Sequence, residues 1–302
     1  KYYKKVIEIN PLYVNAYYNL AIVFQNLNES NKAINFYKKA IKIKPNFINP
    51  RWNLYGYASD IEEALSILKK IYKIDNKHIR SKIMISALKG FKGDLKEIDN
   101  LLISSEANHA YTRSIKWIFS LPRLPKIYFN RSDFFNSVKA LAENSRPFYE
   151  FGVWEGASFR NLIKTFKKGF GFDTFTGLPE AWHNEKINSY SSFGSIPKIK
   201  GGEFIVGKFE DTLPEFFAKE KPIASLINFD ADLYSSTLCA LNYSNKVIDE
   251  KTILIFDEMI MNKHWEEDEF KALNQFCDNL GYSYEVLAFS FATKQVAVKL
   301  NK

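Results

Sequence analysis

Hydrophobic residues in the C-terminal half of the chain gather into short runs that alternate with stretches of helical periodicity. Strands are predicted at the apolar runs 148–152, 169–173, 203–207, 223–230 and 252–257. Helices are predicted to begin between or after these strands, near Ser158, Glu210, Ser236 and Glu266. This alternation predicts an α/β fold whose parallel sheet is covered by helices on both faces.

The C-terminal end of the chain breaks this alternation. Two β-rich runs, 282–289 and 295–300, are separated only by a short polar turn at 292–294. Runs so close in the sequence predict an antiparallel hairpin. We expect this hairpin on the edge of the sheet.

The N-terminal third has a longer period. Eight residues stand at the offsets of one tetratricopeptide repeat, in which small side chains let two antiparallel helices approach and aromatic side chains fill the gaps: Tyr17, Leu20, Ala21, Phe24, Ala33, Tyr37, Ala40 and Pro45. Tyr3, Val6 and Pro11 fit the end of a preceding repeat, and the pattern continues at Ala64, Leu68 and Ile71. We therefore predict an all-α repeat solenoid.

The boundary between the two regions is expected where Pro122 and Pro125 interrupt the helical pattern, before a helix that opens at Ser132 or Asp133. We predict a repeat domain over 1–125 and an α/β domain over 126–302. Because the chain begins with a lysine in mid-repeat, we expect the sequence to be a fragment with more repeats before it. The concave surfaces of such repeats usually bind peptides or proteins, which predicts a protein partner, and the alternative is homodimerisation through the apolar edge left by the missing repeats.

Composition narrows the class of protein further. At 302 residues and 46% hydrophobic, the chain can form two domains with buried cores, and it has no apolar run long enough to span a membrane. Cys239 and Cys277 fit helical patterns as small core residues, which is compatible with a cytoplasmic location. The net charge is +8, but the lysines are scattered along helix faces. This spacing predicts solvated faces and not a nucleic-acid site, while an acidic substrate or partner stays open.

One segment, FYEFGVWEG, predicts a nucleotide-type binding site at the first strand of the α/β domain. Gly152 and Gly156 permit a tight turn, Ser158 can cap the next helix, and Asp173 ends the next strand, where an acid can bind ribose hydroxyls. Bulky Val153 and Trp154 occupy positions where a pyrophosphate would need bare backbone, and Glu150 would repel phosphates. The turn therefore favours S-adenosylmethionine, a cationic cofactor. The alternative is an ordinary α/β protein with a glycine turn.

Several motifs follow in order: E-F-G-V-W-E-G-x-S, D-T-F-T-G-L-P, G-K-F-E-D-T-L-P, D-A-D-L-Y-S-S-T and F-D-E. With these motifs, roughly residues 148 to 300 resemble the macrocin and mycinamicin type O-methyltransferases, which are class I S-adenosylmethionine-dependent enzymes. The resemblance implies a Rossmann-like, mostly parallel sheet with an antiparallel last strand. It places these residues around the cofactor, with Trp154 or Phe209 able to stack on adenine: Glu150, Gly152, Trp154, Gly156, Ser158, Asp173, Phe209 and Asp230.

Carboxylates at neighbouring strand ends predict a metal site. Asp230, Asp257 and Glu258 follow two apolar strands, and adjacent parallel strand ends lie about 5 Å apart. Oxygen ligands favour Mg²⁺ or Ca²⁺, and the resemblance implies a divalent metal, with Mg²⁺ expected, that binds adjacent substrate hydroxyls. The family more often has two aspartates, or aspartate with asparagine, at the last two positions. The alternative is that these are ordinary strand-end acids and that Asp232 shapes the turn into a helix cap at Ser235 or Ser236.

Histidines supply the candidate catalytic base. His264 follows the last predicted metal strand directly and is the first candidate, while His183 lies in the long loop 180–202 and is the second. Asp230 completes the predicted catalytic residues. These features together predict methyl transfer from S-adenosylmethionine to a hydroxyl of a sugar, a glycan or another polyhydroxylated small molecule. Three alternatives stay open: a metal-free N- or C-methyltransferase, a dinucleotide-dependent enzyme, and a scaffold with a degenerate methyltransferase domain.

Overall fold

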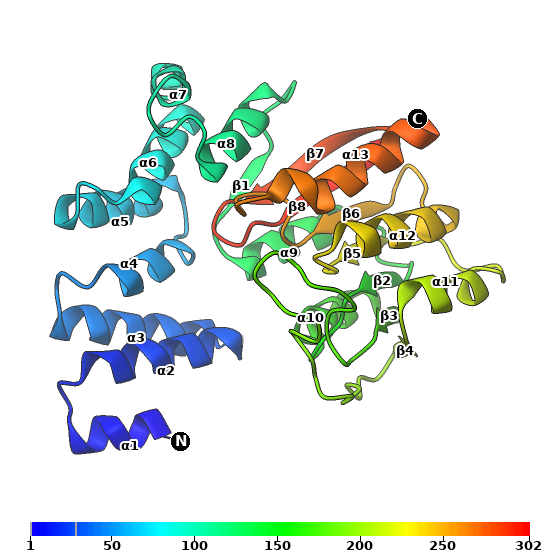
Figure 1. The fold of residues 1–302 in the computed structure, drawn as a ribbon, viewed down its shortest axis with the longest axis horizontal. Coiled ribbons are helices and arrows are strands. Elements are labelled where there is room, and N and C mark those ends of the chain that lie inside the picture. Colours follow the sequence, from blue (N-terminus) through cyan, green and yellow to red (C-terminus); the bar gives the residue numbers. More distant parts are fainter. Residues whose placement is uncertain (1, 28) are drawn as a thin grey trace. The chain divides into compact units, whose positions relative to one another are not determined.

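A computed structural model describes residues 2–27 and 29–302 of the chain. These residues form two compact units, which divide between Trp117 and Ile118. Figure 1 draws both units. Within the described residues, no helix combines the length and the apolar character needed to cross a membrane.

The N-terminal unit is built from short helices that pack in sequence order (Figure 1). Their bounds are α1 Tyr2–Ile9, α2 Val14–Asn26, α3 Ser30–Ile43, α4 Ile48–Tyr55, α5 Ile61–Ile74, α6 Ile79–Phe91, α7 Leu95–Leu102 and α8 Ala110–Ser120, the last of which crosses the division between the units. No strand of the described sheet comes from this unit. The predicted all-α solenoid is confirmed.

The core of the first repeat contains the residues that the 34-residue pattern selects. Leu20, Ala21 and Phe24 of α2 are buried against Ala33 and Tyr37 of α3. The hydroxyl of Tyr37 would be costly to bury alone. It donates to Gln25 at 2.7 Å and accepts from the Asn53 amide at 2.8 Å, so a single buried hydroxyl ties α2, α3 and α4 together.

The C-terminal unit contains a sheet of eight strands in the described residues, in the order β1-β7-β8-β6-β5-β2-β3-β4. The strand bounds are β1 Lys126–Tyr128, β2 Phe148–Phe151, β3 Gly169–Asp173, β4 Gly202–Val206, β5 Leu226–Phe229, β6 Ile253–Phe256, β7 Ser283–Ser290 and β8 Val296–Asn301. All pairings are parallel except those that β8 makes with β6 and β7. The predicted mostly parallel sheet with an antiparallel last strand is confirmed.

The hairpin formed by β7 and β8 lies one strand further inside the sheet than its sequence predicts. β8 is inserted between β6 and β7, and the short strand β1 pairs with β7 along residues Lys126 to Tyr128. β1 therefore forms the edge, and the expectation of an edge hairpin was wrong on this point. Three residues carry too little pattern to reveal a strand that only its pairing with β7 defines.

Helices cover both faces of the sheet (Figure 1). Their bounds are α9 Arg131–Leu141, α10 Ala157–Phe166, α11 Phe209–Phe216, α12 Tyr234–Ser244 and α13 Glu269–Leu280, with 3-10 turns η1 at Asn245–Val247 and η2 at Trp265–Glu267. Side chains of α9 and α10 form one apolar core with Phe148, Leu226 and Ile255 of the sheet. α11 packs its phenylalanines on the other face, and α12 contacts both α11 and α13.

Two predicted helix caps differ from the structure. Gly156, at φ +76°, is the N-cap of α10, and the side chain of Ser158 does not cap the helix. Leu233 precedes α12, so neither Ser235 nor Ser236 caps it, and the Ser235 hydroxyl donates to Glu180 at 2.5 Å. In both places a special backbone conformation next to the strand end fixes where the helix begins, with Asp232 at φ +59° before α12.

Candidate functional site

The register of the sheet brings four sequence-distant residues into one row at the carboxyl ends of its central strands. Phe256 pairs with Phe229, Phe229 with Phe151, and Phe151 with Phe172. The residues that follow them are therefore neighbours in the same order: Asp257, Asp230, Gly152 and Asp173. In an open parallel sheet this edge, next to the first strand, is where ligands bind.

Directly beneath this row the four phenylalanines form a ladder. Neighbouring rings stack with centroids 4.8 to 5.4 Å apart and interplanar angles of 10° to 19°. All four side chains are fully buried. The ladder fills the α11 to α13 side of the strand ends and makes a rigid floor under the acidic row.

Gly152 permits the closest approach in the site. Its φ of +90° is a conformation that side chains disfavour, and a Cβ built there would lie 1.8 Å from the carbonyl oxygen of Asp230. The Asp230 amide also donates to the Phe151 carbonyl at 2.8 Å, so the turn and the end of β5 are held together. Only glycine fits at this position.

Asp173 orders the glycine turn from the neighbouring strand. Its Oδ2 accepts hydrogen bonds of 2.7 Å from the backbone amides of both Val153 and Trp154. Its Oδ1 accepts from the Phe175 amide at 2.6 Å. A carboxylate has about four acceptor positions, so these three bonds leave room for one more donor. The predicted cofactor residue therefore also has a structural role that its sequence position does not reveal.

Glu150 forms a buried polar pair with a residue of the next strand. Asn228 is its register partner on β5, and the Asn228 amide donates to Glu150 Oε1 at 2.8 Å. Both side chains are fully buried, and among the described residues Glu150 Oε2 and Asn228 Oδ1 have no hydrogen-bond partner. Burial raises the pKa of Glu150 to about 8, although nearby Ser158 and Asn228 act to lower it. Buried polar atoms without partners are unusual and indicate a place where a ligand or water binds.

The other predicted cofactor residues lie around the same turn. Trp154, at φ +48°, has an exposed side chain whose Nε1 donates to the Ser191 carbonyl at 3.4 Å and whose ring meets Tyr190 edge-on. Phe209 is buried and contacts Phe151 edge-on at 5.6 Å. Of the two predicted stacking aromatics, Trp154 is thus the accessible one.

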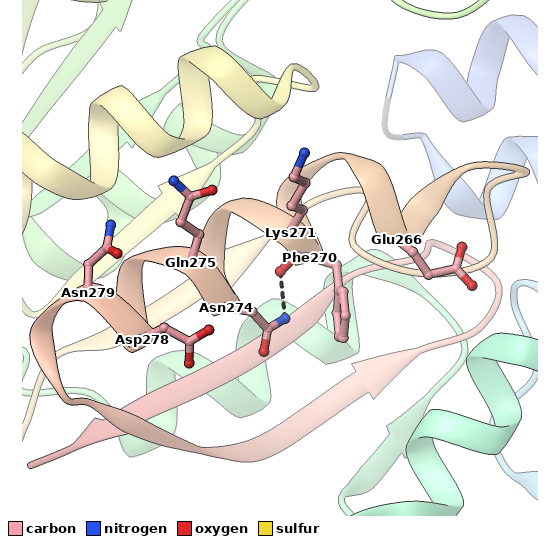
Figure 2. Close-up of a pocket in the computed structure, with 7 residues that line it drawn as sticks. All are labelled: Glu266, Phe270, Lys271, Asn274, Gln275, Asp278 and Asn279. Atoms are coloured by element: carbon pink, nitrogen blue, oxygen red, sulfur yellow. Dashed lines mark hydrogen bonds between the residues drawn. The ribbon is translucent and has the colours of Figure 1, made fainter.

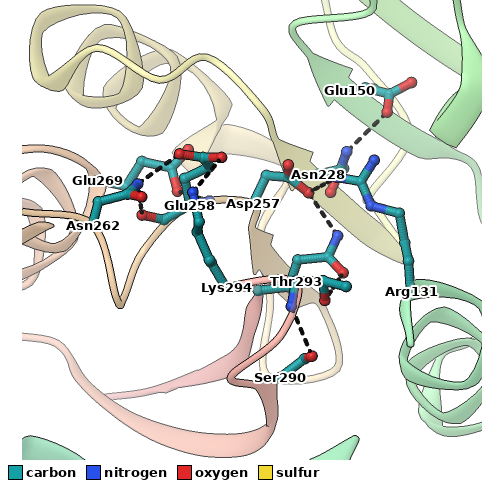
Figure 3. A network of polar contacts seen from close by, with 11 residues as sticks. Arg131, Glu150, Asn228, Asp257, Glu258, Asn262, Glu269, Ser290, Thr293 and Lys294 are labelled. Atoms are coloured by element: carbon teal, nitrogen blue, oxygen red, sulfur yellow. Dashed lines mark hydrogen bonds and ion pairs between the residues drawn. The ribbon is translucent and has the colours of Figure 1, made fainter. Parts of the chain in front are cut away.

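Two of the three predicted metal ligands, Asp257 and Glu258, have cationic and amide partners on their side chains. Arg131 forms an ion pair with Asp257 Oδ1, which also accepts from the buried Gln295 side chain at 2.6 Å. Figure 3 shows these contacts together with those of Glu258, whose Oε1 lies 3.1 Å from Lys294 Nζ. Glu258 Oε2 accepts from the Asn262 amide at 2.6 Å. Two of the three acids are thus neutralised by residues of the chain.

This arrangement does not fit a divalent metal on these carboxylates. No group of three or more His, Cys, Asp or Glu side chains within the described residues is arranged to hold a metal ion. Two unit positive charges about 4 Å apart repel by about 4 kcal/mol at an effective dielectric constant of about 20. A divalent ion on Asp257 would face that repulsion from Arg131 roughly twice over. The predicted metal site is not confirmed.

Excess negative charge surrounds the acidic row. Burial, reinforced by neighbouring carboxylates, raises the pKa of Asp230, Asp232 and Glu269 well above their ordinary values. The Asp257 carboxylate repels Asp230 and also acts on Asp232 and Glu269. A cationic ligand would relieve this mutual repulsion, which Arg131 and Lys294 only partly offset.

The two histidines that were candidates for the base lie side by side. His183 and His264 stack with ring centroids 4.9 Å apart and an interplanar angle of 24°. His183 Nε2 lies 2.7 Å from Oδ2 of the buried Asp268, whereas His264 Nδ1 is 3.6 Å from the exposed Glu267. A buried carboxylate fixes an imidazole better than an exposed one, so the geometry favours His183 over His264.

The loop between β3 and β4 brings His183 to this place. Its backbone bonds to itself at Leu178 and Ser189, and Pro197 lies against Gly156. Burial raises the pKa of Tyr190 to about 12, with further contributions from Glu185, Asp232 and Glu258. The loop therefore covers the carboxyl edge with a histidine, a tyrosine and a tryptophan contact.

Five residues of the site were missed in the sequence: Arg131, Asn228, Asp268, Lys294 and Gln295. Asn228 could have been found, because it is the one amide in the apolar run LINF of β5. The others stand in polar surroundings where a charged or amide residue is ordinary. Only the fold brings Arg131 to Asp257, which lies 126 positions later.

A groove of about 450 Å³ elsewhere in this unit is a poor candidate for the site. It is lined by Glu266, Phe270, Lys271, Asn274, Gln275, Asp278 and Asn279 (Figure 2). On α13 these positions alternate with the buried face formed by Glu269, Ala272, Leu273 and Phe276. The groove therefore lies on the outer face of the helix, away from the acidic row.

Comparison with a family model identifies the first repeat. Residues 14–47 match the model described as "Tetratricopeptide repeat". These residues are a tetratricopeptide repeat. They correspond to α2 and α3 with the turn that follows, which is the segment that the 34-residue pattern predicted. The comparison with curated proteins gave no match.

Solved structures with similarity to the chain include methyltransferases and tetratricopeptide repeat proteins. The O-methyltransferase NovP is 15% identical with a TM-score of 0.41, covering 57% of this chain and 80% of NovP. The calicheamicin methyltransferase CalS11 is 18% identical with a TM-score of 0.44, covering 69% of this chain and 91% of CalS11. YrrB, a tetratricopeptide repeat protein with an unusual peptide-binding site, is 20% identical with a TM-score of 0.32, covering 38% and 62%.

Proposed function

We propose that the C-terminal unit binds S-adenosylmethionine and transfers its methyl group to a hydroxyl oxygen of a polyhydroxylated small molecule. The observation that carries this proposal is the fully buried Glu150 beside the Gly152 turn, with its Oε2 atom lacking a partner among the described residues. A buried carboxyl group in an electronegative site suits a cationic cofactor. S-adenosylmethionine brings a sulfonium and an ammonium group, and its sulfonium supplies the electrophilic methyl.

The hydrogen bonds of the turn speak against a dinucleotide. A pyrophosphate needs free backbone amides at the glycine turn. Here the amides of Val153 and Trp154 both donate to Asp173 Oδ2. A phosphate would have to displace that carboxylate and would meet the acidic row as well. An adenosine ribose needs only the remaining acceptor position of Asp173 and no backbone amide of the turn.

His183 is the proposed general base. Asp268 Oδ2 would accept the proton on Nε2, which leaves Nδ1 with the lone pair that takes the proton from the substrate hydroxyl. His264 stacks on the same ring and limits its rotation. Removing the hydroxyl proton as the oxygen attacks makes the oxygen a stronger nucleophile, and the imidazolium that forms is stabilised by Asp268.

The proposed activity is tested by methyl transfer from radiolabelled S-adenosylmethionine to a panel of sugars, nucleotide sugars and catechol-type acceptors. Transfer to a hydroxyl that depends on His183 supports the proposal. Transfer to an amine or a carbon with equal rate in His183→Gln would instead support a methyltransferase of another class. Cofactor binding without transfer to any acceptor would favour a scaffold with a degenerate methyltransferase domain.

The N-terminal unit is proposed to recruit a protein partner or a protein-bound substrate, as repeat solenoids commonly do. The repeat at 14–47 belongs to this unit, and its buried side chains pack on one another there. A chain that lacks residues 1 to 110 should therefore keep cofactor binding, since Glu150, Gly152 and Asp173 all belong to the other compact unit. Loss of cofactor binding in this shortened chain would show that the repeats contribute to the catalytic unit.

A further inference from the structure

We infer that Arg131 and Lys294 act as built-in cations that supply the positive charge needed by the strand-end carboxylates, so that the site works without a divalent metal. This inference rests on the proposed function for the chemistry of the site. Whether these cations take the place of a metal can be tested separately. Arg131 and Lys294 are positioning residues in this proposal. They hold the carboxylates and are not assigned a contact with the reacting atoms.

Arg131 serves the ends of three neighbouring strands. It is the first residue of α9, and its guanidinium pairs with Asp257 after β6 while interacting electrostatically with Asp230 after β5 and Glu150 on β2. A guanidinium is not deprotonated in proteins, so Arg131 balances the centre of the row at every working pH.

Asp257, the acidic partner of Arg131, also accepts a hydrogen bond from a second side chain. The buried Gln295 donates through Nε2 to the same Asp257 Oδ1 at 2.6 Å, and its own Oε1 accepts from the Thr293 hydroxyl at 3.1 Å. Asp257 therefore lies between two donors, and Figure 3 shows its contact with Arg131. Because both donors bind Oδ1, this oxygen would have to give up one of them to bind a metal ion.

Lys294 supplies the positive charge for Glu258, the second strand-end acid with a cationic partner. It lies in the turn between β7 and β8 at φ +64°, and its Nζ is 3.1 Å from Glu258 Oε1. Asn262 binds the other oxygen of Glu258 at 2.6 Å, so both oxygens of this carboxylate are already engaged.

The experiment measures Mn²⁺ binding by electron paramagnetic resonance on the full chain, with Arg131→Met as the central variant. Methionine has a similar reach but no charge, so it leaves Asp230 and Asp257 without their cation. We expect wild type to show no specific Mn²⁺ site. Arg131→Met should bind Mn²⁺ at least about tenfold more tightly than the limit set by wild type, because a fixed repelling charge is removed. Arg131→Lys, which keeps the charge, should behave like wild type.

Arg146→Met is the matched control. Arg146 makes a comparable ion pair in the same unit, with both Asp249 oxygens at 2.8 and 2.9 Å, but away from the acidic row. It should not gain Mn²⁺ binding. A specific Mn²⁺ site in wild type that Asp257→Asn removes would overturn the proposal, as would an Arg131→Met protein that is folded by circular dichroism and gains nothing.

Wild type gives a second reading that does not depend on any variant folding. Methyl transfer should be unchanged in excess EDTA, and its loss on chelation with recovery by Mg²⁺ would overturn the proposal. Titration with S-adenosylhomocysteine in parallel tests the proposed function separately from the built-in cations. Failure to bind this ligand would contradict the proposed function, whereas the Mn²⁺ result decides the built-in cations by itself.

Discussion

The carboxylate of Asp173 lies with its Oδ2 atom 2.7 Å from the backbone nitrogen of Trp154, so the acid that ends β3 holds the turn that leaves β2. The same oxygen accepts from Val153, and Oδ1 accepts from Phe175. The strand-end acid is therefore engaged before any ligand arrives. It can meet a ribose only as part of a turn that it has already shaped.

Asp173→Asn should weaken both the turn and cofactor binding. The asparagine amide places a donor where the structure has backbone donors, so at least one of the three hydrogen bonds is lost. We expect the affinity for S-adenosylhomocysteine to fall by roughly 1.5 to 3 kcal/mol, measured by calorimetry. Asp211→Asn, an exposed acid in the first turn of α11, is the control and should bind like wild type. Equal affinity of the two variants would remove Asp173 from the site.

Gly152→Ala should damage the C-terminal unit far more than the same change at another glycine with positive φ. A Cβ at Gly152 would collide with the Asp230 carbonyl, whereas at Gly281, with φ +70°, no atom lies within 4 Å among the described residues. Gly281→Ala should cost about 1 to 2 kcal/mol from backbone strain alone. Gly152→Ala should cost more than about 4 kcal/mol or prevent folding. Urea unfolding measures both, and equal costs would show that the close approach is not a constraint.

Glu150 should make the stability of the C-terminal unit depend on pH. Its pKa rises from an ordinary value of 4.5 to about 8 because of burial, so the folded unit holds a proton that the unfolded chain releases within this window. The free energy of unfolding should therefore fall as pH rises from about 4.5 to 8, by up to about 1.4 kcal/mol per pH unit. This contribution is complete below the window and lost above it.

Comparison with Glu150→Gln isolates that contribution. The buried acids Asp230, Asp232 and Glu269 also have raised pKa values and act in the same direction in both proteins. The variant should gain stability relative to wild type as pH rises through the window, with Glu215→Gln, an exposed acid on α11, as the control that does not. If urea unfolding gives a constant difference in free energy of unfolding between wild type and Glu150→Gln from about pH 5 to pH 8, the raised pKa is contradicted.

The elements around the site could be predicted from the sequence because they depend on local pattern. Strands β2 to β6 are short β-rich runs, and the structure places β3 at the predicted residues and the others within three residues of their predicted ends. Asp257, Asp230, Gly152 and Asp173 stand at one edge because the register of buried strands follows from their hydrophobic faces. That part of the site could therefore be predicted from the sequence.

The partners of these residues were not accessible, since they come from pairings across the fold. Nothing near Arg131 indicates that its side chain reaches Asp257, and Lys294 lies in a turn where lysine is ordinary. The sequence alone thus shows Asp230, Asp257 and Glu258 without neighbouring cations, and a bound metal ion is the obvious source of positive charge. Gly156 is likewise the αL N-cap of α10 in place of the cap expected at Ser158, and Pro197 and Ile199 from a distant loop lie close against it.

His183→Gln should lower the rate of methyl transfer by roughly 10² to 10⁴-fold, the usual contribution of a general base, while S-adenosylhomocysteine binding stays near wild type. Asp268→Asn should lower it less and shift the pH profile, because the imidazole loses the carboxylate 2.7 Å from Nε2. His264→Phe keeps a ring to stack on His183 and is the control that should retain most activity. A larger loss in His264→Phe than in His183→Gln would make His264 the base.

Calorimetric titration of the full chain with S-adenosylhomocysteine, beside an identical titration with NAD⁺, tests the central claim most directly. One molecule of S-adenosylhomocysteine should bind per chain, with weaker binding in Asp173→Asn, because Asp173 offers its last acceptor position and the acidic row favours the ammonium group. NAD⁺ should give no binding heat, since the amides of the turn are occupied. Binding of NAD⁺ without S-adenosylhomocysteine, or of neither, would contradict the assignment.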